Sequence, residues 1–140
     1  MKYLKSIFEA AGEKVELQDF CEMYLAYLID DGFKVEVSRT PAFKDTLTIK
    51  IIAEKGTKLT TWDNIKDKLI PFFSMLVKNY NVGVSPNQSR PFHPSWLEST
   101  VTFFSNNQTQ SPTIDINKLI DDQPYTLNGI FLIELNVHPK

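Results

Sequence analysis

The first 31 residues end in a strongly amphipathic stretch. Between Leu17 and Asp31, apolar residues recur at i, i+3, i+4 and i+7, so that they share one face. We therefore predict a helix over this range. Gly32 follows directly and suits the left-handed position after a helix end. The residues of the apolar face are Leu17, Phe20, Cys21, Tyr24, Leu25 and Leu28.

Strict alternation replaces the helical period after Gly32. Apolar and polar residues alternate over 33–38 and again over 47–52, where Ile52 is an apolar exception on the polar side. Each run predicts a half-buried strand. The link between them is short, and a parallel return needs a crossover of a dozen or more residues. We therefore expect an antiparallel hairpin.

A second helix is predicted over 62–79, with apolar residues on one face. Thr60 and Asp63 have the spacing of a capping box at its start. Pro71 lies inside this range, where it lacks a backbone donor. We expect it to kink the helix or to split it in two. A short strand is predicted over 82–85.

The remaining chain reads mainly as strands. Residues 96–104 and the last strand, from about 130 to 137, are apolar in alternation. In the last strand, Phe131 and Ile133 are expected on one face and Ile130 and Leu132 on the other. Residues 114–122 are either a short helix capped by Asp115 or an extended piece with one turn.

These elements predict an α+β protein in the order α-β-β-α-β-β-α-β. A mainly antiparallel sheet and two amphipathic helices would form a two-layer sandwich. Residues 1–15 are expected to be an N-terminal leader or arm, and residues 16–140 a single domain. Within that domain we expect an αββαβ core to about residue 85 and a β-rich extension over 86–140.

Composition narrows the function classes. The 140 residues are 42% apolar and carry 10 Phe, 5 Tyr and 2 Trp, enough for a core, which excludes a disordered chain. The net charge of −2 excludes a globally basic nucleic-acid binder. Neither a signal peptide nor a membrane span is predicted. We expect a cytoplasmic protein whose one cysteine, Cys21, is a free, buried thiol.

Candidate reaction chemistry is sparse. His93 lies in a proline-rich loop, where a catalytic residue can lie. However, no serine or cysteine motif and no carboxylate occurs at a spacing from His93 that is typical of a catalytic site. Asp63 and Asp67 are neighbours on the second helix, and the flanking lysines favour a solvated face over a metal site. The five glycines form no phosphate-binding loop. We therefore predict no catalytic residue, metal or cofactor.

Charge is unevenly distributed along the chain. Residues 1–80 contain 24 charged residues (12 basic, 12 acidic), whereas residues 81–140 contain 8 (3 basic, 5 acidic). Interface centres are poor in charge and rich in aromatics, so the second part predicts a contact surface. An ordinary core with polar loops would have the same composition. The predicted contact residues are Phe92, Trp96, Phe104, Ile130 and Leu132.

The first ten residues, MKYLKSIFEA, resemble the leader of internal head proteins of T-even-type bacteriophages. In that family the leader is cut after an aliphatic-any-Glu tripeptide. Ile7, Phe8 and Glu9 match the tripeptide, and Ala10 follows. The resemblance implies cleavage between Glu9 and Ala10.

The layout from Leu25 to Tyr80 is similar to that of small tailed-phage proteins without an assigned activity. It rests on the segments Leu28–Phe33, Trp62–Asp67 and Ile70–Phe72. It implies an αββα module and a phage origin.

Our leading hypothesis is a non-enzymatic phage protein that contacts other phage proteins, host proteins or its own copies. It would act in the host cytoplasm or as a minor virion or packaged head component. Two alternatives stay open: a host-takeover or nucleic-acid-binding accessory protein, and a small enzyme that uses His93.

Overall fold

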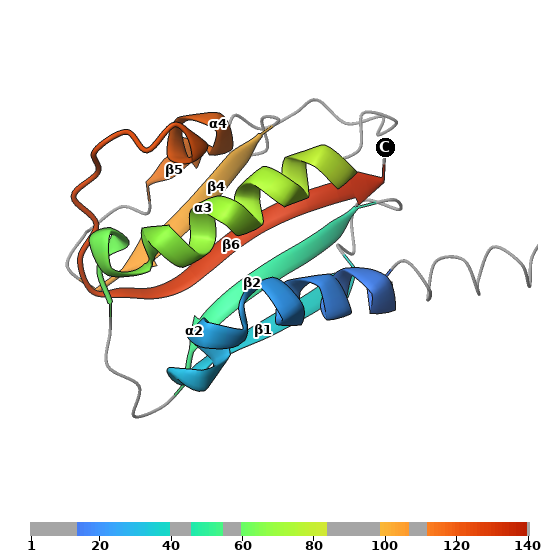
Figure 1. The fold of residues 1–140 in the computed structure, drawn as a ribbon, viewed down its shortest axis with the longest axis horizontal. Helices are drawn as coiled ribbons and strands as arrows, with labels where there is room; N and C mark the ends of the chain where they lie inside the picture. The colour runs from blue at the N-terminus through green and yellow to red at the C-terminus, as the bar shows by residue number, and fades with distance from the viewer. Residues whose placement is uncertain (1–13, 40–45, 55–59, 84–98, 107–111, 140) are drawn as a thin grey trace, which may run out of the picture.

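The helices and strands roughly follow the predicted order, with one additional short strand over Thr113–Asp115. The structure is a computed structural model that describes residues 14–39, 46–54, 60–83, 99–106 and 112–139 (Figure 1). A first helix over residues 14–24 precedes the other elements. These are α2 (Ala26–Asp30), β1 (Phe33–Arg39), β2 (Leu47–Ala53), α3 (Trp62–Asn79), β3 (Tyr80–Val82), β4 (Thr100–Ser105), β5 (Thr113–Asp115), α4 (Ile116–Ile120) and β6 (Ile130–Pro139).

Within the described residues the sheet has six strands, all antiparallel to their neighbours, with the main order β1-β2-β6-β4-β5. β3 also pairs with β6, beyond the end of β4. The last strand of the chain is therefore central: it pairs with β2 along one side and with β4 and β3 along the other. The two ends of the sheet are β1 and β5.

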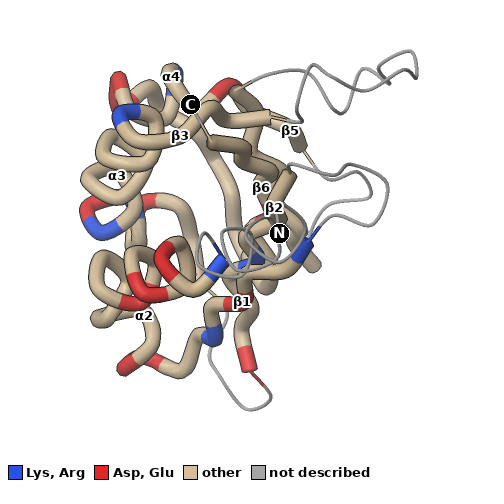
Figure 2. Tube along the Cα trace, turned by 90° about the vertical axis from the view of Figure 1, so that its right-hand side faces the viewer, with Lys and Arg blue, Asp and Glu red and all other residues tan. Residues whose placement is uncertain are grey.

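The helices form one layer against one face of this sheet (Figures 1 and 2). The first helix and α2 lie over β1 and β2, and α3 crosses over β6 and β4. This confirms the predicted α+β class and its two layers. The largest fully buried side chains lie between the layers and include Trp62, Phe72, Phe73 and Phe103.

The predicted first helix is interrupted once. Residues 14–24 are helical, Leu25 lies in a turn, and α2 continues to Asp30. Leu25 and Leu28 are both buried, so the apolar face persists across the interruption. Gly32 has φ 102°, as expected for the left-handed residue after a helix.

The predicted cap of α3 is wrong by one residue. Thr61, with extended backbone angles, is the N-cap, and its hydroxyl accepts a hydrogen bond from the Asn64 N–H at 3.3 Å. Thr60 instead forms a β-bridge with Ile130. Pro71 does not split the helix, because α3 runs unbroken from Trp62 to Asn79.

The ambiguous stretch after residue 112 combines both alternatives. It is extended in β5 and then turns into the short helix α4. The Asp115 carboxylate caps α4 by accepting from the Asn117 N–H at 2.8 Å. The predicted cap residue is therefore correct.

The predicted alternation in β6 fails at its start. Phe104 pairs with Leu132, but the next residue, Ser105, pairs with Ile130, so Phe131 is an extra residue in a β-bulge. The bulge reverses the alternation: Ile130 is fully buried, whereas Phe131 is 39% exposed. The sequence pattern carries no sign of the bulge, because both residues are apolar.

Candidate functional site

The predicted contact residues have different positions in the fold. Phe104 and Leu132 lie half-buried on the sheet face opposite the helices. Ile130 was expected on that face and is instead inside the core, which is a correction. Phe92, Trp96 and His93 lie outside the described residues, as do Glu9 and Ala10 of the predicted leader.

The face opposite the helices, hereafter the helix-free face, carries an apolar row near one end of its strands. Residues directly opposite on antiparallel strands point to the same face. Ile52 pairs with Leu132, and Leu132 pairs with Phe104. These three residues, the apolar row, span β2, β6 and β4. The ring of Phe131 lies 6.4 Å from that of Phe104 and extends the aromatic surface.

A charged row runs beside the apolar row. Glu36 of β1 pairs with Lys50 of β2, and Lys50 pairs with Glu134 of β6. Lys34, at the β1 end of the apolar row, forms an ion pair with Glu36 at 2.8 Å. The helix-free face therefore has two lysines and two glutamates next to the apolar row.

The contact between Lys34 and Glu36 shifts the pKa of both side chains. The hydrogen bond and charge of Glu36 raise the pKa of Lys34, and the same contact lowers the pKa of Glu36. Both side chains are exposed, so solvent screens the interaction and its contribution to stability is small.

Hydroxyl and amide groups complete the face away from the apolar row. Thr48 Oγ1 donates to Asn136 Oδ1 across β2 and β6 at 2.8 Å. The Thr102 and Thr113 hydroxyls are 3.3 Å apart across β4 and β5. These paired polar groups make the border of the face hydrophilic.

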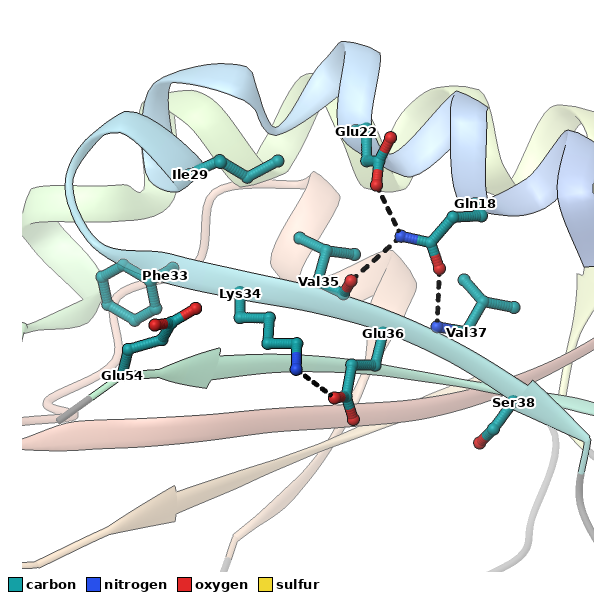
Figure 3. Close-up of a pocket in the computed structure, with 10 residues that line it drawn as sticks. All are labelled: Gln18, Glu22, Ile29, Phe33, Lys34, Val35, Glu36, Val37, Ser38 and Glu54. Carbon is teal, nitrogen blue, oxygen red and sulfur yellow. Dashed lines mark hydrogen bonds and ion pairs between the residues drawn. The ribbon is translucent and has the colours of Figure 1, made fainter.

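A groove of about 560 Å³ follows the outer edge of β1, between that strand and the first helix (Figure 3). Gln18 of the first helix spans it. Its Nε2 donates to the Val35 carbonyl at 3.0 Å and to Glu22 Oε1 at 2.9 Å, and its Oε1 accepts from the Val37 N–H at 2.9 Å. The side-chain amide thus binds the strand edge as one residue of a parallel strand would.

Sequence reasoning named two of the four apolar residues of the helix-free face and did not single out the groove. Ile52 was available from the alternation of β2, which places it on the polar side. Phe131 was assigned to the buried face because its bulge has no sequence signature. Gln18 reads as an ordinary polar residue of a helix, so nothing in the pattern distinguishes it.

The described part of the chain contains neither a cluster of metal-ligating side chains nor a helix able to span a membrane. Among its residues, no three His, Cys, Asp or Glu side chains gather closely enough to bind a metal ion. None of its helices has both the length and the apolar character needed to cross a bilayer. The second histidine, His138, is buried, and its Nδ1 is 3.3 Å from the Gly83 carbonyl oxygen.

Comparison with protein families, with curated proteins and with solved structures finds no match to this chain.

Proposed function

We propose that this protein works through protein–protein contact, and that a second copy of the chain binds its helix-free face. The observation that carries the proposal is the apolar row of Ile52, Leu132 and Phe104, which crosses the three central strands of a face that also has charges of both signs. Apolar contact residues flanked by polar ones are the usual anatomy of a protein interface.

The strand register makes this face complementary to itself. A twofold axis that runs along the strands between β2 and β6 would place each β2 residue over its own cross-strand partner in the other copy. Lys50 would then meet Glu134 of the second copy, and Ile52 would meet Leu132 of the second copy, because these are the observed pairs. Two sheets packed in this aligned manner lie about 10 Å apart.

The same axis also brings together the residues at the two ends of this line across the sheet. Lys34 pairs with Ile52, and Phe104 pairs with Leu132, so the two lie at opposite ends of one line across the sheet. The axis exchanges these ends and brings the Lys34 ammonium towards the ring of Phe104 in the second copy. A cation over an aromatic face is attractive and becomes more so when water is excluded.

Sedimentation velocity over a concentration series tests the proposal. We expect the wild-type protein to dimerise. Phe104→Lys and Leu132→Lys each place a charge in the apolar row. Each should weaken the dimer about 30-fold or more, which is the usual effect of losing a contact residue that dominates an interface.

Tyr27→Lys is the matched control, because Tyr27 is 72% exposed on α2, in the helix layer on the other side of the sheet. It should leave the dimer intact, and near-UV circular dichroism checks that all three variants fold. A monomeric wild type at the highest concentration reached, or a dimer that both sheet variants retain, would contradict the proposal.

We also propose a tailed-phage origin and a role as a minor virion or packaged head component, as the resemblance of residues 1–10 and 25–80 implies. Mass spectrometry of purified virions tests this role. A chain beginning at Ala10 in the virion supports cleavage after Glu9, and an intact Met1 there removes that part of the proposal.

A further inference from the structure

The outer edge of β1 offers backbone groups to a partner. β2 is its strand neighbour in the sheet. In an antiparallel ladder, the N–H and C=O of alternate residues point away from the neighbouring strand. The two bonds to Gln18 identify Val35 and Val37 as outward-pointing residues. No strand of the described residues pairs with this side of β1, and a strand edge without a strand partner is a template for a further strand.

Gln18 holds the position that such a strand would take. Its carboxamide supplies one donor to Val35 and one acceptor to Val37, which is what one residue of an added parallel strand supplies through its N–H and C=O. The exchange of the side chain for a peptide therefore leaves these backbone groups satisfied. Gln18 itself would keep its bond to the Glu22 carboxylate.

Acidic residues outnumber basic ones among the described residues that line the groove. Glu22 lies on the helix side, and Glu36 and Glu54 lie below the strand on the other side (Figure 3). Among these described lining residues Lys34 is the one basic residue, and its charge is matched by its ion pair with Glu36. The groove therefore favours a cationic ligand.

The apolar part of the groove lies on the helix side. Ile29 projects from α2 above β1 and is 37% exposed (Figure 3). An added strand would turn alternate side chains towards Ile29 and the others towards Glu36 and Glu54, because side chains of a strand alternate between its faces. The pattern that fits is apolar residues alternating with basic ones.

We propose that β1 is a strand-addition site for an extended segment of a partner protein in which apolar and basic residues alternate. The segment displaces the Gln18 carboxamide and pairs with the outward groups of Val35 and Val37. Backbone hydrogen bonds provide the affinity, and the carboxylates of Glu36 and Glu54 select the basic residues. The site is at the sheet edge, and its test does not depend on dimerisation through the helix-free face.

The test uses a fluorescent peptide of alternating valine and lysine with blocked ends, measured by fluorescence anisotropy against the full chain. We expect saturable binding. The same peptide with an N-methyl group on every residue keeps its charge but cannot donate backbone hydrogen bonds along either edge, so it should not bind. A peptide with glutamate in place of lysine should also fail to bind.

Two substitutions examine the edge itself. Gln18→Ala removes the competing amide and should tighten peptide binding about fivefold, the worth of roughly one net hydrogen bond. Val35→Pro removes an outward N–H while leaving the β2 ladder intact, and it should abolish binding. Since the N-methylated peptide is tested on the wild-type chain, the proposal can fail even if a variant does not fold.

Charge selection has its own control. Glu54→Gln should weaken binding about threefold through the loss of one favourable charge contact. Asp19→Asn removes one charge from the first helix, at a residue that does not line the groove. This variant should bind the peptide as the wild type does.

Three results would overturn the proposal. The first is the absence of saturable binding to both the wild-type and Gln18→Ala chains. The second is equal binding of the N-methylated peptide, which would show that charge alone attracts it. The third is edge-to-edge dimerisation of the Gln18→Ala chain without peptide binding, which would show that Gln18 only protects β1 from pairing with its own copies.

Discussion

Cys21 shows how burial sets the chemistry of a single residue. Its side chain has no exposed surface and belongs to the core beneath the first helix. Desolvation, with a smaller effect from the nearby Glu22 charge, raises the pKa of Cys21 to about 12. The thiol therefore stays protonated at neutral pH, and its role is that of a small apolar side chain.

The Cys21 pKa predicts an alkaline loss of stability. The ordinary value is 9.0, so the unfolded chain releases this proton at a lower pH than the folded chain does. The contribution of the protonated Cys21 thiol to the free energy of unfolding is complete below pH 9.0 and is lost as the pH rises towards about 12. In that window the free energy of unfolding should fall by up to about 1.4 kcal/mol per pH unit.

Urea unfolding of the wild type and of Cys21→Ala between about pH 8 and about pH 11 measures this loss, because tyrosine and lysine titration is common to both chains. The alanine variant is less stable at the start, and its free energy should decline less steeply with pH. Equal slopes would show that the Cys21 thiol does not titrate as its burial implies.

At the scale of elements, α3 depends on a local cap and on contacts with the sheet. Its N-cap is Thr61, and its buried face carries Trp62, whose ring lies 5.7 Å from that of Phe103 on β4. The ring of Phe72 lies 6.0 Å from that of Phe20 on the first helix. α3 thus packs against both the sheet and the other helix, which supports its continuity through Pro71.

Adjacent threonines at the start of α3 allow a matched comparison. Thr61→Ala removes the hydroxyl that accepts from the Asn64 N–H and should lower the free energy of unfolding by about 1 kcal/mol. Thr60→Ala keeps this cap. Among the described residues the Thr60 hydroxyl contacts only the Thr61 carbonyl, at 3.4 Å, so the loss should be smaller. Chemical denaturation measures both, and an equal or larger loss for Thr60→Ala would contradict the assigned cap.

For the whole molecule, the decisive feature is the central position of the last strand. β6 pairs with β2, β3 and β4, so the predicted N-terminal core and the C-terminal extension share one sheet. The buried residues of β6, including Ile133 and Leu135, lie in the same core as those of the first helix and α3. The two parts of the chain are therefore expected to fold together.

A fragment that ends at residue 85 tests this dependence. Without β6, the inner edge of β2 has no partner, and the apolar faces of β2 and α3 are exposed to water. We expect the fragment to lack a cooperative urea transition and near-UV circular dichroism, whereas the full chain shows one transition. A fragment that unfolds cooperatively would show that the N-terminal part is a unit of its own.

Much of this protein follows from local pattern. The helical periods before Asp31 and over 62–79 and the alternation of the strands determine the α+β class, because a chain must turn its apolar face towards a core whatever its topology. The cap of α4 at Asp115 follows for the same local reason. These features depend on residues that are neighbours in the sequence.

Only the tertiary structure decided the surfaces. The place of β6 between β2 and β4, and the bulge that buries Ile130 and exposes Phe131, arise from pairing between distant segments. The binding of Gln18 to the edge of β1 needs the first helix docked on the sheet. Local pattern specifies which side of an element is apolar, but the contacts between elements determine which of its residues remain available to a partner.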